Sequence, residues 1–89
     1  MKAIVTVVGK DRVGIIAGVC VKLAEYNVNV LDISQTVMQG YLTMMMATDV
    51  SQCNVPLAGL VSQMDAVGKE MGLSIRVQRE DIFEAMHRI

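Results

Sequence analysis

Apolar and polar positions along the chain follow spacings that predict four β-strands. Residues 3–8 are a β-branched run without helical spacing, which indicates a strand buried on both faces. Residues 30–39 alternate, with Leu31, Ile33 and Val37 on one side and polar side chains on the other. Gly40 marks a turn, and residues 41–49 and 73–78 predict the third and fourth strands.

Helical spacing predicts two helices between these strands. The first covers residues 14–26 and ends at Asn27, a residue type that suits a left-handed C-terminal position. Its apolar stripe consists of Ile16, Val19, Cys20 and Leu23. The second is expected to open at Asn54 and Pro56 and to end at Gly72, because asparagine caps well and proline is tolerated in a first turn.

The resulting order, βαββαβ, predicts a ferredoxin-like α+β fold, in which a four-stranded antiparallel sheet carries two helices on one face. Residues 1–80 would form this domain. Residues 81–89 would add a short C-terminal helix, whose apolar face consists of Ile82, Met86 and Ile89. This topology places the second and fourth strands at the sheet edges.

The predicted edge strand over residues 30–39 lacks the features that usually discourage pairing. It contains no Lys, Arg or Pro, whereas the fourth strand carries Arg76 and Arg79. The first helix also has more apolar surface than one sheet needs, at Ala17, Val21 and Ala24. We therefore expect a homodimer formed through the second strand and the first helix.

Composition narrows the functional classes. The chain has 89 residues, 53 % of them hydrophobic, and a formal net charge of −1, so it offers no basic face for nucleic acid. No run of apolar residues is long enough to span a membrane, and no secretory signal is visible, so we expect a cytoplasmic protein. Cys20 and Cys53 are single and far apart, which gives no disulfide or metal pair.

Chemistry-bearing side chains are scarce, and the sequence predicts no enzyme, no cofactor and no metal site. A catalytic centre needs a nucleophile with a base, or paired acids, and His87 is the single histidine. Met44, Met45 and Met46 send alternate side chains to both faces of a strand, which favours packing over a copper site.

The loop from Gly9 to Gly14 is the strongest candidate for ligand binding. It joins a strand to a helix N-terminus, where free N–H groups and the helix dipole favour a carboxylate or phosphate. Asp11 could accept hydrogen bonds from an ammonium group, and an α-amino acid offers both charges. From composition alone the favoured interpretation is that Asp11 caps the helix and Arg12 is a solvated surface charge.

The run Gly-Lys-Asp-Arg-Val-Gly-Ile-Ile at residues 9–16, followed by Tyr-Asn-Val-Asn-Val at 26–30, resembles the signature of the ACT domain. This family comprises amino-acid-sensing modules of many metabolic enzymes, and the similarity covers residues 1 to about 80. The ending Asp-Ile-Phe-Glu-Ala-Met-His-Arg-Ile resembles that of small stand-alone ACT-domain proteins.

The resemblance implies a ligand site between subunits, built from this loop and from the start of the second strand of the neighbour. It implicates the loop residues Asp11, Arg12, Val13, Gly14 and Ile15, with Asn29 from the partner. Two departures bear on specificity. Val13 replaces the usual proline, and Gly9 offers no side chain where serine-binding members have histidine.

Two functions therefore remain open at this point. The first is a regulatory domain that binds an amino acid or a related small metabolite as a homodimer and acts on a protein partner. The second is a protein–protein interaction module that binds no metabolite. A thermal response to ligand separates the two.

Overall fold

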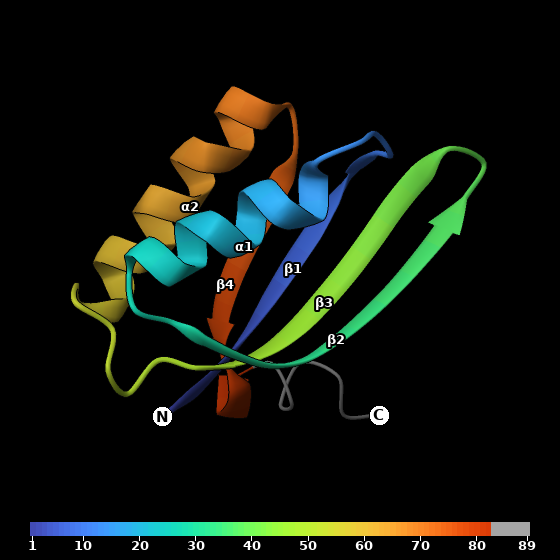
Figure 1. Cartoon of the computed structure of the whole chain (residues 1–89). Helices are drawn as coiled ribbons and strands as arrows, with labels where there is room; N and C mark the ends of the chain where they lie inside the picture. The colour runs from blue at the N-terminus through green and yellow to red at the C-terminus, as the bar shows by residue number, and fades with distance from the viewer. Residues whose placement is uncertain (83–89) are drawn as a thin grey trace.

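The computed structural model describes residues 1–82, and it has the predicted ferredoxin-like α+β fold (Figure 1). Its elements are β1 (Lys2–Lys10), α1 (Ile15–Glu25), β2 (Asn29–Met38), β3 (Tyr41–Asp49), α2 (Leu57–Met71) and β4 (Ser74–Arg79). All neighbouring strands are antiparallel, in the order β2-β3-β1-β4, so β2 and β4 are the edges. A helical turn begins at Glu80, and the rest of the predicted C-terminal helix lies outside the described residues.

The core lies between the sheet and the two helices, which cover the same face (Figure 1). Its largest fully buried side chains include Leu23, Leu42, Met44, Met46, Leu60 and Met64. The prediction that the first strand is buried on both faces is wrong. Val5 and Val7 are fully buried under the helices, whereas Val8 on the opposite face is 41 % exposed. The sheet therefore has one covered face and one open face.

The apolar stripe of α1 is rotated relative to the prediction. Ile15, Val19 and Leu23 are buried, whereas Ile16 is 38 % exposed and Cys20 is half-buried. The helix presents more apolar side chains than the sheet can cover, and both Ile16 and Val21 are left exposed. The predicted stop at Asn27 is confirmed by its left-handed φ of 60°.

β2 differs from a regular strand near its start. Val30 pairs with Thr48 and Asp32 pairs with Ala47, so Leu31 is the extra residue of a β-bulge. Beyond the bulge the predicted alternation holds, because Ile33 lies opposite the buried Met46. Asp32, Ser34 and Thr36 consequently face the open side of the sheet. The turn to β3 is confirmed at Gly40, where Gln39 and Gly40 both have positive φ.

The predicted capping role of Asn54 is wrong. α2 begins at Leu57, and its N-cap residue, Pro56, supplies no side-chain hydrogen bond. Asn54 instead donates from its side chain to the Glu25 carbonyl and from its backbone N–H to the Tyr26 carbonyl. The carbonyls at the end of a helix have no partners within it, and the loop after β3 folds back to satisfy those of α1.

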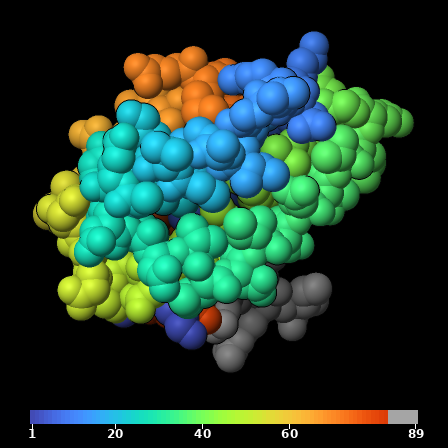
Figure 2. Space-filling model, viewed as in Figure 1, coloured from blue at the N-terminus to red at the C-terminus, as the bar shows by residue number. Residues whose placement is uncertain are grey.

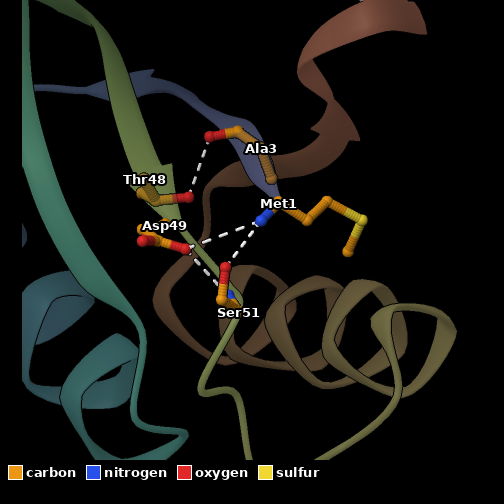
Figure 3. Close-up of polar contacts among 5 residues, drawn as sticks. All are labelled: Met1, Ala3, Thr48, Asp49 and Ser51. Atoms are coloured by element: carbon orange, nitrogen blue, oxygen red, sulfur yellow. Dashed lines mark hydrogen bonds and ion pairs between the residues drawn. The ribbon is translucent and has the colours of Figure 1, made fainter.

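Polar contacts join the start of β1 to the end of β3 (Figure 3). Thr48 donates its hydroxyl to the Ala3 carbonyl at 2.8 Å, and the Met1 ammonium group donates to the Ser51 hydroxyl at 2.6 Å. The Ser51 hydroxyl and backbone N–H hold the pKa of Asp49 below its ordinary value, with a smaller effect from the Met1 ammonium. These contacts keep the ends of both central strands in register.

Candidate functional site

The loop between β1 and α1 is held at both of its ends by other elements. A side chain at Gly9 would place its Cβ 2.4 Å from the Leu73 Cδ2 atom, so glycine allows β1 to lie close to the start of β4. The Asp11 N–H donates to the Gly40 carbonyl at 2.9 Å, which ties the loop to the turn between β2 and β3. The loop thus has a fixed position relative to the sheet edge that β2 forms.

Arg12 points away from that edge. Its guanidinium donates to the Met71 carbonyl at the C-terminal end of α2. Carbonyls there lack partners within the helix, and the helix dipole favours a positive charge near them. In this structure Arg12 fixes the loop to α2, which is a structural role that the sequence pattern could not reveal.

We expect Arg12→Ala to lower the free energy of unfolding by about 1 kcal/mol, the net value of a typical hydrogen bond, because water screens this exposed charged donor. Thermal denaturation would measure the loss. Lys10→Ala is the matched control, because it removes a nearby exposed positive charge whose side chain makes no hydrogen bond or ion pair within residues 1–82. Equal melting temperatures for the two variants would contradict the structural role of Arg12.

Gly14 begins α1 in a left-handed conformation, with φ of 92°, and provides no side-chain cap. No atom lies within 4 Å of the position that a Cβ would take, so the space above Gly14 is open. The first turn of α1 contains no acidic residue. Its N–H groups are therefore available to an anion.

The other loop residues differ in what they can offer a ligand. Val13 is fully exposed, whereas Ile15 is buried and can contribute only its backbone. Asp11 is exposed, and its carboxylate makes no hydrogen bond or ion pair within residues 1–82. An acceptor of hydrogen bonds thus lies close in sequence to the free N–H groups of α1.

Asn29 does not join this group within one chain. It is exposed at the start of β2, where it lines a shallow hollow with Ala24 and Gln52 near the C-terminal end of α1. The 11 residues of α1 extend about 16 Å, and they separate Asn29 from Gly14. A site that used both residues would need two copies of the chain.

Gly40 is the contact that sequence reasoning missed. A signal for it existed, because Lys10 and Tyr41 pair at the end of the β1–β3 ladder. This register places the turn beside the residue that follows Lys10.

In the described part of the chain, no cluster of three potential metal-ligating side chains is present. No helix among the described residues is long and apolar enough to cross a membrane.

The family profile described as the ACT domain matches residues 2–78. This chain therefore belongs to the ACT domain family, as the loop motif had suggested. The family comprises regulatory domains that bind small molecules.

Relatives of known sequence match the whole chain. A UPF0237 protein of Clostridium acetobutylicum is 54 % identical over 89 residues, with full coverage of both chains. A UPF0237 protein of Listeria innocua is 49 % identical over 89 residues, also with full coverage of both. These relatives place the chain, within the ACT domain family, in the UPF0237 group.

Solved structures share the fold. An ACT domain protein from Streptococcus pneumoniae has 46 % sequence identity and a TM-score of 0.83, and the match covers 98 % of each chain. A formyltetrahydrofolate deformylase from Pseudomonas syringae has a TM-score of 0.79 at 22 % identity, over 88 % of this chain and 27 % of that one. The latter likeness concerns the fold alone.

Proposed function

We propose that this protein is a non-catalytic regulatory domain that binds an amino acid between two copies of itself. The observation that carries the proposal is the hydrogen bond from the Asp11 N–H to the Gly40 carbonyl. This bond ties the loop between β1 and α1 to the turn at the end of β2. The loop therefore adjoins the surface through which a second copy would pair.

The surface that supports pairing is the α1–β2 face, which we define as Ile16, Ile33 and Val37. These side chains are 38 %, 41 % and 52 % exposed. α1 and β2 both lie on the side turned toward the viewer in Figure 2. Ile33 and Val37 are the cross-strand partners of Met46 and Leu42, so their side chains point to the helix side of the sheet. They lie beyond the area that α1 covers. A second α1–β2 face would bury them.

Two-fold symmetry would complete the site. A two-fold dimer is self-complementary, so β2 would pair antiparallel with the β2 strand of its mate. The start of one strand then lies beside the end of the other. Asn29 of the partner subunit would thus approach the turn at Gly40, and through it the loop that contains Asp11. This arrangement unites two groups that α1 separates in a single chain.

An α-amino acid fits the chemistry of such a site. Its carboxylate would accept hydrogen bonds from the N–H groups at the start of α1, above the open space at Gly14. Its ammonium group would donate to the Asp11 carboxylate. Amide atoms of the partner subunit's Asn29 would supply a polar contact from across the interface.

A thermal-shift screen against amino acids and related metabolites tests this function. Ligand at about 100 times its dissociation constant should stabilise the fold by roughly 2.7 kcal/mol. In a domain of this size the shift amounts to several degrees. Asp11→Ala and Asn29→Ala should each remove most of the shift, because each deletes a polar contact to the ligand.

Glu70→Ala is the matched control, because it removes an exposed carboxylate on α2 that makes no hydrogen bond or ion pair within residues 1–82. This variant should keep the full response. If no compound raises the melting temperature, the interaction-module function is favoured instead. Equal binding to the wild-type protein and to both site variants would mean that a ligand binds elsewhere.

A further inference from the structure

The edge strand β4 has a groove beside it. The backbone of β4 pairs with β1 on one side, and no strand among residues 1–82 pairs with its other side. α2 packs against β4 on the helix side of the sheet (Figure 1). The groove between these two elements is lined by Val61, Ser62 and Asp65 of α2 and by residues 75–78 of β4. An edge of this kind can accept an extended peptide as an additional strand.

The register of β4 decides which side chains an added strand would meet. Ile75 and Val77 pair with valines of β1 that are fully buried under the helices, so their side chains point to the helix side. Arg76 lies between them and points to the open face of the sheet. The same alternation continues in an added strand. Its residue opposite Arg76 would lie on the open face, and the two neighbours of that residue would point into the groove.

Arg76 supplies the charge that selects among such peptides. Its side chain is exposed and makes no hydrogen bond or ion pair within residues 1–82. The other charges at this edge already have partners. Arg79 donates to Asp81 at 2.7 Å, and Asp65 forms an ion pair with Lys69 at 3.3 Å. A carboxylate opposite Arg76 would therefore form a favourable cross-strand pair, whereas a Lys or Arg there would be repelled.

The groove itself favours apolar side chains. Val61 forms its α2 wall and is 39 % exposed, and its floor consists of the aliphatic residues Ile75 and Val77. Side chains that cover Val61 would remove apolar surface from water. The preferred peptide thus has an acidic residue with an apolar residue on each side of it.

A second copy of the chain fits this edge less well. Two β4 strands paired about a two-fold axis would bring both Arg76 side chains onto one face of a ladder only six residues long, where like charges repel. Pairing of β4 with β2 of another copy would be head-to-tail, which builds rings or open filaments instead of a dimer. The edge therefore suits a segment of a different protein.

We propose that β4 and α2 form a docking site for an extended acidic segment of a partner protein, which adds to the sheet beside β4. The segment places Asp or Glu opposite Arg76, and the apolar residues on either side of it enter the groove against Val61. A dimer formed through β2 leaves both β4 edges uncovered. The site is therefore independent of the amino-acid site and of the dimer proposed above.

A labelled peptide, Ser-Thr-Val-Glu-Val-Thr-Ser, tests the site by fluorescence anisotropy. We expect saturable binding of one peptide per chain. Replacing the central Glu of the peptide by Lys, or Arg76→Glu in the protein, should weaken binding roughly three- to tenfold, because either change makes the cross-strand pair repulsive. The two changes together should restore binding. Lys10→Glu is the matched control, since it changes the net charge equally at an exposed cation away from the groove, and it should leave the affinity unchanged.

N-methylation of the peptide separates strand addition from other modes of binding. Consecutive N–H groups of a strand point to opposite edges, so methylation of the Glu nitrogen and methylation of both Val nitrogens block different edges. One of these two peptides should lose binding, and the other should keep it. Equal effects of the two methylations, or equal affinities of the Glu and Lys peptides for the wild-type protein, would overturn the proposal.

Two further results would also contradict this docking site. One is the absence of saturable peptide binding at about 1 mM, the weakest range that corresponds to a specific contact. The other is sedimentation of the wild-type protein as species larger than a dimer that Arg76→Glu dissociates, since another copy of the chain would then occupy the edge. Circular dichroism checks that each protein variant is folded.

Discussion

Ile33→Asp is expected to convert the proposed dimer into a monomer at micromolar concentration. Ile33 is 41 % exposed on the α1–β2 face, so the folded protomer tolerates the carboxylate in water. In the dimer the carboxylate would be buried among apolar side chains without a partner, at a cost of several kcal/mol. Because a two-fold dimer contains two copies of residue 33, the free-energy cost of burying the carboxylate arises twice. A loss of about 3 kcal/mol alone weakens association by about two orders of magnitude.

Sedimentation velocity on the wild-type protein and the variant would measure the change. Val61→Asp is the matched control, because Val61 is 39 % exposed on α2, the helix that packs on β4 at the opposite edge of the sheet from β2. It should leave the dimer intact. A dimeric Ile33→Asp variant, or a wild-type protein that is already monomeric, would rule out this interface.

The strands and turns could be predicted because their signals are local. Residues 41–49 were expected to return as a strand after the turn at Gly40, and the structure has a strand with those bounds. Gly72 was expected to end the second helix, and it takes the left-handed conformation that closes α2, with φ of 71°. Asn27 ends α1 in the same way. In each case one residue type fits one backbone conformation, and no distant contact is needed.

The errors concern features that depend on distant partners. Asn54 has the chemistry of a helix cap, but the unpaired carbonyls of α1, at Glu25 and Tyr26, bind it instead. The bulge at Leu31 depends on the pairing of β2 with β3. The alternation of β2 by itself shows no extra residue. Both features depend on contacts between distant segments, and the pattern of a single sequence does not show which segments come into contact.

The candidate site also has a part that local sequence signals predict and a part that depends on distant contacts. The loop could be located from its own residues, because a glycine-bounded turn at a helix start is a local pattern. The environment of Arg12 could not, because Met71 lies 59 residues away in sequence. The separation of Asn29 from Gly14 follows from the length of α1. Whether the two meet depends on a second chain, which the sequence of one chain cannot describe.

Gly68→Ala is expected to cause the largest loss of stability among the single substitutions considered. Gly68 is buried near the end of α2, where a Cβ would lie 2.7 Å from the Leu73 carbonyl oxygen and 3.3 Å from the Ile75 nitrogen. Both obstacles are backbone atoms, and Leu73 also donates to the Gly68 carbonyl at 2.7 Å. The last turn of α2 would therefore have to move away from β4.

Overpacking of this kind typically costs 1–3 kcal/mol, roughly 4–8 °C in melting temperature for each kcal/mol in a domain of this size. Gly59→Ala is the control in the same helix. A Cβ at Gly59 would meet the Val55 Cβ at 3.6 Å, an ordinary contact, so the variant should be neutral or gain up to about 1 kcal/mol of helix propensity. Thermal denaturation at one fixed protein concentration compares the two, because association also raises the melting temperature. If both alanine variants melted at or above the wild-type temperature, α2 could not lie as close to β4 as this structure places it.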